Sequence, residues 1–239
     1  MERPKVLITG INGKIAQVLV RELSGEWDIY GIDLEGDGER TLAADLSDWH
    51  QLEDAFGRIG RPDAVIHLGA IASSRASWDD VLKNNIIGTR YVYENAKNIG
   101  AGKVIFASSV HVMGGYDYEY LGSGKLLSAD APIRPDGDYG TSKAFGEALA
   151  RQYWENYRLP SVCLRIGNVT REDDPRGDER LMAIWLSHRD LVHLMHRCLL
   201  ADVDYGVYFA CSGNTTRFWD LSLTERDLGY ESRDDSSRL

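Results

Sequence analysis

Short apolar runs alternate regularly with longer amphipathic stretches, and this alternation limits the possible folds more than any other feature of the sequence. The apolar runs are predicted strands and lie at residues 6–8, 29–32, 64–68, 104–107 and 162–166. The amphipathic stretches are predicted helices around residues 13–24, 48–57, 78–99, 139–157 and 187–200. Because the strands are continuously apolar, we expect a parallel sheet that is covered on both faces. The predicted fold class is therefore α/β, a Rossmann-type doubly wound parallel sheet.

Residues 114–138 and 167–186 interrupt the alternation. The first segment is rich in Gly, Tyr, Asp and Pro and has no period, so we interpret it as a long loop. The second is charged and contains Pro175 and Gly177, which predicts a loop with a short helix. Both follow predicted strands, and loops at the carboxyl ends of parallel strands line the ligand crevice. Residues 231–239 are expected to form a frayed tail.

Composition excludes several classes of function. The formal net charge of −10 argues against a nucleic-acid surface, and no apolar run approaches the ~20 residues that span a bilayer. The three cysteines are too far apart for a disulfide framework or a CxxC metal site, which favours reduced thiols in the cytoplasm. His188, His193 and His196 have helical spacing among apolar residues, so we expect a packed helix and no metal site.

The first predicted strand runs into a glycine-containing turn, with Gly10, Gly13 and Ala16 spaced as GxxGxxA before a helix. Glycines at such a turn let the backbone approach a pyrophosphate at a helix N-terminus. Asp33 ends the second strand, twenty residues after Gly13, where a carboxylate accepts hydrogen bonds from ribose hydroxyls. A carboxylate there repels a 2′-phosphate, and the nearest arginine is Arg40. The pattern predicts NAD rather than NADP.

Other strand ends extend the predicted cofactor site. Asp45 and Leu46 follow a further extended segment, where they are expected to contact adenine, and Leu68-Gly69-Ala70 ends another strand with small residues. The full set of expected cofactor contacts is Gly10, Asn12, Gly13, Lys14, Ile15, Asp33, Asp45, Leu46, Leu68, Gly69, Ala70, Asn85, Ala107, Tyr139, Lys143 and Ile166.

Tyr139 and Lys143 are the candidate catalytic residues, because a spacing of four places both on one face of a helix. A tyrosine with its ordinary pKa near ~10 is a poor base at neutral pH. A neighbouring ammonium favours the phenolate and lowers that pKa. Ser109, thirty residues before Tyr139 at the end of a predicted strand, is expected to hydrogen-bond the same reacting oxygen.

Together these motifs resemble the extended short-chain dehydrogenase/reductase superfamily, the NAD-dependent epimerase/dehydratase family. The resemblance rests on Gly10-xx-Gly13, Asp33, Asp45-Leu46, His67-Leu68-Gly69-Ala70, Asn85-Ile86-Ile87-Gly88-Thr89, Phe106-Ala107-Ser108-Ser109, Tyr139-xxx-Lys143 and Leu164-Arg165. It implies the fold, NAD, and the catalytic roles of Ser109, Tyr139 and Lys143. It also implies that Asn85 orders the active site through its helix, and that the chain forms a homodimer or a higher homo-oligomer.

A sharper resemblance lies in the C-terminal half, where Arg165-Ile166-Gly167-Asn168, Arg180 and Trp185-Leu186-Ser187-His188-Arg189-Asp190 are similar to uronate dehydrogenases and haloarchaeal NAD-dependent glucose-6-phosphate dehydrogenases. It implies oxidation of an anomeric hydroxyl to a lactone, with Arg180 binding the anionic group of the sugar. Val110 departs from these relatives, which carry Asn there, and leaves the sugar open among uronates, sugar phosphates and neutral aldoses. The expected substrate contacts are Ser73, Ser109, Val110, His111, Tyr139, Asn168 and Arg180.

The predicted function is that of an NAD-dependent sugar dehydrogenase with Tyr139 as base, acting on a cyclic aldose derivative expected to be anionic. Residues 1–166 are expected to bind NAD and carry the catalytic residues, and residues 167–239 to form a small substrate-binding portion packed on the same domain. One alternative is a sugar-nucleotide epimerase or dehydratase, which would retain NAD tightly and form no net NADH. A second is a non-catalytic NAD sensor, which has no need of the Ser-Tyr-Lys set.

Overall fold

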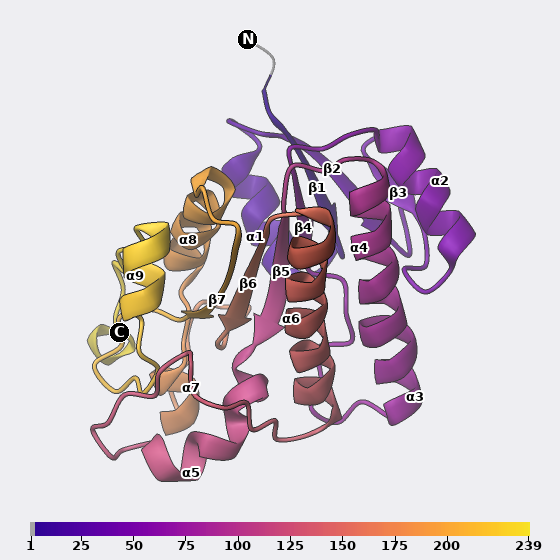
Figure 1. The fold of residues 1–239 in the computed structure, drawn as a ribbon. Coiled ribbons are helices and arrows are strands. Elements are labelled where there is room, and N and C mark those ends of the chain that lie inside the picture. The colour runs from indigo at the N-terminus through magenta and orange to yellow at the C-terminus, as the bar shows by residue number, and fades with distance from the viewer. Residues whose placement is uncertain (1–2) are drawn as a thin grey trace.

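The computed structural model describes residues 3–239 as three layers, a parallel sheet between two layers of helices (Figure 1). The sheet has seven strands in the order β3-β2-β1-β4-β5-β6-β7, and every pair is parallel. The strands are β1 (Lys5–Thr9), β2 (Asp28–Asp33), β3 (Thr41–Ala43), β4 (Ala64–His67), β5 (Val104–Ser109), β6 (Ser161–Ile166) and β7 (Tyr205–Ala210). The doubly wound α/β class predicted from the sequence is confirmed.

Helices cover both faces of the sheet. The α-helices are α1 (Lys14–Leu23), α2 (Trp49–Ile59), α3 (Trp78–Asp80), α4 (Gly88–Asn98), α5 (Asp117–Tyr120), α6 (Asp138–Tyr157), α7 (Glu179–Ala183), α8 (His188–Leu200) and α9 (Ser222–Leu228). A π-helix η1 (Val81–Ile87) joins α3 to α4, and two 3₁₀-helices are η2 (Val110–Tyr116) and η3 (Ser236–Arg238). Helices α1 and α8 pack together on one face, and α2, α4 and α6 on the other.

Each face of the sheet has its own apolar core, which explains the continuous apolar runs. Adjacent residues on a strand point to opposite faces. On β1, Ile8 packs with Leu19 and Leu194 on the α1/α8 side. Its neighbour Leu7 packs with Phe56 of α2 on the other side. Both faces of the central strands therefore require apolar side chains.

The chain order reverses between β1 and β4, which are neighbours in the sheet. In an open parallel sheet, this switch point opens a crevice at the carboxyl ends of the two strands. Gly10 follows β1 with φ +72°, and a Cβ on it would lie 2.7 Å from the backbone of Gly69, which follows β4. A side chain at position 10 would therefore meet both a strained backbone conformation and the opposite wall of the crevice.

Some secondary structure differs from the sequence prediction. Strand β7 is the edge strand next to β6; it lies in residues 167–239 and was not predicted, although residues 207–211 form a continuous apolar run. The helix predicted over 78–99 contains the π-helical stretch η1, which changes the residues that face the sheet. The segment predicted as a loop over 114–138 begins within η2 and continues as α5 before it becomes irregular.

The prediction of a frayed tail at residues 231–239 is wrong. Asp190 of α8 is fully buried, and its carboxylate accepts hydrogen bonds from the backbone amides of Arg233 (2.8 Å) and Asp234 (3.1 Å). A buried carboxylate needs such donors, and the tail supplies them from more than forty residues away. A local analysis of composition cannot detect that partnership. Within residues 3–239, no helix combines the length and apolar character needed to cross a membrane.

Candidate active site

Two adjoining cavities run along the carboxyl ends of the strands, with volumes of about 370 Å³ and 330 Å³. They share four lining residues at the switch point, namely Gly10, Gly13, Leu68 and Ala70. The first cavity extends toward β2 and β3, and the second toward β5 and β6. Together they form a single elongated cleft, as an extended ligand requires.

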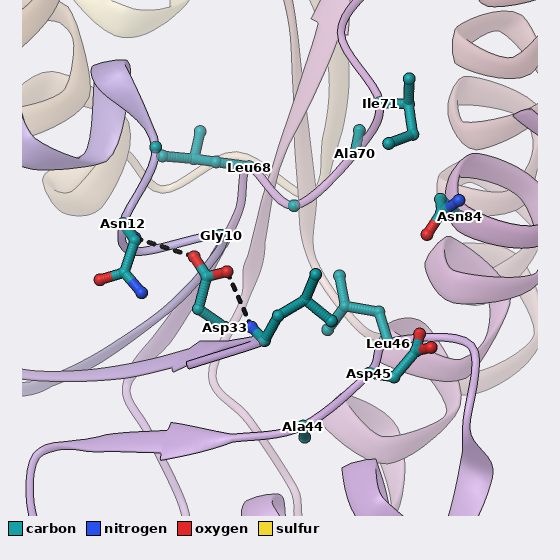
Figure 2. Close-up of a pocket in the computed structure, with 13 residues that line it drawn as sticks. Gly10, Asn12, Asp33, Ala44, Asp45, Leu46, Leu68, Ala70, Ile71 and Asn84 are labelled. Atoms are coloured by element: carbon teal, nitrogen blue, oxygen red, sulfur yellow. Dashed lines mark hydrogen bonds between the residues drawn. The ribbon is translucent and has the colours of Figure 1, made fainter. Parts of the chain in front are cut away.

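Asp33 lies at the β2 end of this cleft, beside the first glycine turn (Figure 2). Its carboxylate accepts hydrogen bonds from the backbone amides of Asn12 (2.8 Å) and Leu34 (2.8 Å). These bonds fix the carboxylate at the rim of the cavity while lone pairs remain for ribose hydroxyls. Arg40 is bonded to Asp28 and stacks on the ring of Tyr30 at 4.7 Å. Arg40, the arginine nearest to Asp33 in sequence, is therefore held by other partners and is not free to bind a 2′-phosphate. This arrangement fits NAD.

The residues of the turn fit a dinucleotide. Gly13 is followed at once by α1, whose first amides point out of the helix N-terminus. Lys14 and Ile15 of α1 line the second cavity, and burial lowers the pKa of Lys14, assisted by the nearby charge of Arg171. Asp45, Leu46 and the Leu68-Gly69-Ala70 stretch line the walls, as Figure 2 shows for the first cavity.

Ser109, Tyr139 and Lys143 meet on one wall of the second cavity. Ser109 is the last residue of β5, whereas Tyr139 and Lys143 lie one turn apart at the start of α6. Burial raises the pKa of Tyr139, and a hydrogen bond with the Ser109 side chain opposes that shift. Close approach of α6 to η2 depends on Gly140, where a Cβ would lie 2.3 Å from the carbonyl oxygen of His111. The three side chains predicted to be catalytic are thus brought together.

Lys143 is a buried cation whose surroundings are aromatic. It is 4% exposed, and its Nζ lies 5.0 Å from the centre of the Phe106 ring and 5.7 Å from that of Tyr139. Burial lowers the pKa of Lys143 to about 7. A positive charge on Nζ favours the phenolate form of Tyr139, so protonation of the two groups is linked.

Two predicted substrate contacts, His111 and Asn168, also line the second cavity. His111 packs edge-on against Tyr139, with ring centres 5.6 Å apart, and its Nδ1 bonds Asp136 at 2.7 Å. The Asn168 Nδ2 is buried and has no hydrogen-bond partner within residues 3–239. Both side chains carry polar groups near the catalytic wall.

Three other predicted substrate contacts lie elsewhere. Val110 is 2% exposed and packs in the α1/α8 core. Ser73 is exposed and bonds the amide of Arg75, while Ala72 lines the cavity instead. Arg180 of α7 is outside the lining of either cavity and donates from Nε to Asp117 of α5.

Asn85 was predicted as a cofactor contact, but its side chain is engaged in the protein. It accepts from the Ile71 amide (2.8 Å) and donates to the Ile71 carbonyl and to the Ser142 hydroxyl (3.1 Å each). Its neighbour Asn84 lines the first cavity, with Ile71 (Figure 2). Both asparagines lie in the π-helix, whose wider turn changes which residue faces the cleft. Sequence spacing alone carries no signal for this shift.

Comparison with known proteins agrees with this geometry. The family model described as NAD dependent epimerase/dehydratase family matches residues 6–204. An NAD-dependent glucose-6-phosphate dehydrogenase of Haloferax volcanii is 33% identical, over 100% of this chain and 96% of its own length. An L-arabinose 1-dehydrogenase (NAD(P)(+)) of the same organism is 34% identical, over 98% of both chains.

The crystal structure of a mutant uronate dehydrogenase from Agrobacterium tumefaciens, complexed with NAD, superposes with a TM-score of 0.86. It is 31% identical and the match covers 99% of this chain and 87% of that one. The match to the family model and these full-length relatives confirm the resemblance derived from the motifs, and with it NAD as the cofactor. The chain belongs to the NAD dependent epimerase/dehydratase family.

Proposed function

We propose that this chain is an NAD-dependent dehydrogenase that oxidises the anomeric hydroxyl of a cyclic aldose to a lactone. The observation that carries the proposal is the meeting of Ser109, Tyr139 and Lys143 on the wall of the cleft beyond the glycine turn. The relatives named as dehydrogenases of glucose 6-phosphate, L-arabinose and uronate support this reaction type.

In the proposed reaction, the anomeric hydroxyl of the sugar lies between the Ser109 hydroxyl and the Tyr139 phenol. Tyr139, as the phenolate, accepts the hydroxyl proton, and Ser109 holds the reacting oxygen by a hydrogen bond. NAD, when bound, supplies the acceptor for the hydride that leaves the anomeric carbon. The sugar thereby loses one proton and one hydride, and its C–O bond becomes the lactone carbonyl.

Lys143 favours the base form of Tyr139 through its charge. In the folded chain, burial raises the pKa of Tyr139 and lowers that of Lys143. The phenolate and the ammonium stabilise each other, since each neutralises a charge that burial penalises. His111 and Asn168 line the same cavity, and in the proposed complex their polar groups bond ring hydroxyls of the sugar.

The test is Tyr139→Phe, assayed by NADH formation with a panel of aldoses. We expect turnover to fall about 100- to 10,000-fold, the range for loss of a positioned general base. NAD binding, measured by calorimetry, should stay within about threefold, because glycines and Asp33 hold the far end of the cofactor. Retained turnover in Tyr139→Phe would contradict the assignment of the base.

A further inference from the structure

Arg180 and Asp117 form an ion pair that joins two helices beside the catalytic wall. The Nε of Arg180 on α7 donates to the carboxylate of Asp117 on α5, and their side chains are 28% and 14% exposed. Both helices lie at the same end of the molecule in Figure 1. The pair therefore closes a bridge between the two segments that follow β5 and β6.

Both partners are attached to residues that line the catalytic cavity. Asp117 follows directly on η2, which carries His111, and the charges of His111 and Asp136 act on the Asp117 carboxylate. On the other side, Ile184 directly follows α7, and its carbonyl oxygen accepts from the amide of Asn168 at 2.8 Å. The ion pair is thus held next to the side chains proposed to contact the sugar.

The pair changes what Arg180 can recognise. A free guanidinium binds a carboxylate or phosphate bidentately. Here Asp117 already occupies its Nε, and an incoming sugar anion would meet the negative charges of Asp117 and the nearby Asp136. Because Asp117 bonds Arg180 through Nε, a sugar anion would have to approach the two terminal nitrogens against the repulsion of carboxylates that belong to the same chain and are always present.

The surroundings of the Asp117 carboxylate favour its ion pair with Arg180. Its second oxygen, Oδ1, is buried and has no hydrogen-bond partner within residues 3–239. Burial raises the pKa of Asp117, and the bond from Arg180 and its positive charge oppose that shift. Separating the two side chains would leave this carboxylate buried without a compensating charge. Val110 is buried in the core and is apolar, so it offers no polar group that could bind a sugar anion in place of Arg180.

We propose that Asp117 is a specificity-determining residue, which neutralises Arg180 and directs the enzyme to neutral cyclic aldoses rather than to uronates or sugar phosphates. This inference rests on the proposed anomeric oxidation. The resemblance to uronate and glucose-6-phosphate dehydrogenases implies that Arg180 binds an anionic group of the sugar, whereas the contact with Asp117 favours the opposite role.

The experiment measures kcat/KM for NAD reduction with two matched sets of sugars. The neutral set is L-arabinose, D-xylose, D-galactose and D-glucose, and the anionic set is D-galacturonate, D-glucuronate and D-glucose 6-phosphate. We expect the unmodified chain to prefer its best neutral sugar over its best anionic sugar by at least about tenfold. In Asp117→Asn, the anionic-to-neutral ratio should rise at least about tenfold, since the guanidinium is released.

Two control variants identify the source of that change. Arg180→Met in the Asp117→Asn background should abolish the gain on anionic sugars. Glu119→Gln removes the same charge from α5, but its partner is Arg134 at the surface, so the ratio should not change. An equal gain in Glu119→Gln would mean that general charge, not release of Arg180, is responsible, and would overturn the proposal.

The remaining outcomes separate this inference from the proposed function. A preference of the unmodified chain for uronates or glucose 6-phosphate overturns the role of Asp117 but leaves anomeric oxidation intact. Absence of NADH formation with every sugar, in a chain that binds NAD, overturns the proposed function and the inference with it. If Asp117→Asn does not fold, the preference of the unmodified chain still decides between the two substrate classes.

Discussion

Ser108 and Ser109 are neighbours at the end of β5, yet their side chains lie in opposite surroundings. Ser108 donates to Glu147 at 2.6 Å, and Glu147 receives two further bonds from Arg165, at 2.9 and 2.8 Å. Arg165 also donates to the Ala129 carbonyl at 2.9 Å. Every charged group in this network has a close partner inside the protein. On the other side, Ser109 faces the cleft with Tyr139 and the buried ammonium of Lys143.

The difference teaches how to separate structural charges from functional ones. Arg165 and Glu147 are buried and satisfied, so they bind the irregular segment around Ala129 to the sheet. Lys143 is equally buried, but its neighbours are the rings of Phe106 and Tyr139 and an open cavity. Burial of a charge without a complete set of partners costs free energy. Such a cost is typical of groups that a ligand will complete.

The largest expected effect comes from breaking the satisfied network. Arg165→Met leaves the Glu147 carboxylate buried without its cation, and removal of one partner of a buried pair typically costs about 3–5 kcal/mol. We expect the free energy of unfolding, measured by urea denaturation, to fall by that amount. The double variant Arg165→Met/Glu147→Leu should recover much of the loss, because no charge is then left unpaired. A loss below about 1 kcal/mol in the single variant would mean that the network is not structural.

The cofactor end of the cleft could be predicted from the sequence, whereas the substrate end could be predicted only in part. Gly10, Gly13 and Asp33 act through local backbone geometry and fixed spacing, so their positions in the cleft follow from the β1-α1-β2 pattern. Tyr139 and Lys143 likewise share a helix face. The same reasoning gave the α/β class, because continuous apolar strands require two covered faces.

What the sequence could not predict depends on partners that are distant along the chain. Asp117 lies 63 residues from Arg180, and neither residue carries a local sign of the other. The tail is held by Asp190, which is more than forty residues away. The exchange of Asn85 for Asn84 at the cleft arises from a π-helical turn that apolar periodicity does not reveal. In each case a tertiary contact or an irregular turn decides the outcome.

A smaller effect of opposite sign is expected from removing the unsatisfied charge. Burial lowers the pKa of Lys143 from 10.5 to about 7, so between these values the unfolded chain binds more protons than the folded chain. The contribution of Lys143 to folding therefore becomes less unfavourable as the pH rises from 7 to 10.5. At about 1.4 kcal/mol per pKa unit this penalty is at most about 5 kcal/mol. Lys143→Met removes it but also removes the cation–π contacts with Phe106 and Tyr139, so the net gain at pH 7 should be roughly 2–4 kcal/mol.

The measurement is the difference in free energy of unfolding between Lys143→Met and the unmodified chain at several pH values. That difference should shrink as the pH rises from 7 to 10, and turnover should be lost at every pH. Lys125→Met, at an exposed position, serves as the control and should show neither the gain nor the pH dependence. A variant that is less stable than the unmodified chain at pH 7 would show that Lys143 has a structural role like that of Arg165.

The smallest expected difference in the free energy of unfolding is between Ser108→Ala and Ser109→Ala, which change neighbouring residues of β5. Ser108→Ala removes one donor from Glu147, which still holds its bonds to Arg165, and should cost about 1.5–3 kcal/mol. Ser109→Ala removes the oxygen that accepts from the His111 amide and caps η2, at a cost of about 1 kcal/mol.

The two serine variants should differ little in stability but strongly in turnover. Ser109→Ala removes the hydrogen bond to the reacting oxygen, so kcat should fall about 100- to 1,000-fold, as for loss of a donor at a site of developing charge. Ser108 also lines the second cavity, but its hydroxyl is bonded to Glu147, so the kcat of Ser108→Ala should stay within about threefold at temperatures where it is folded. Equal losses of kcat in both variants would show that the Ser108 hydroxyl, on a residue that also lines the second cavity, contributes to the reaction as well as to the fold.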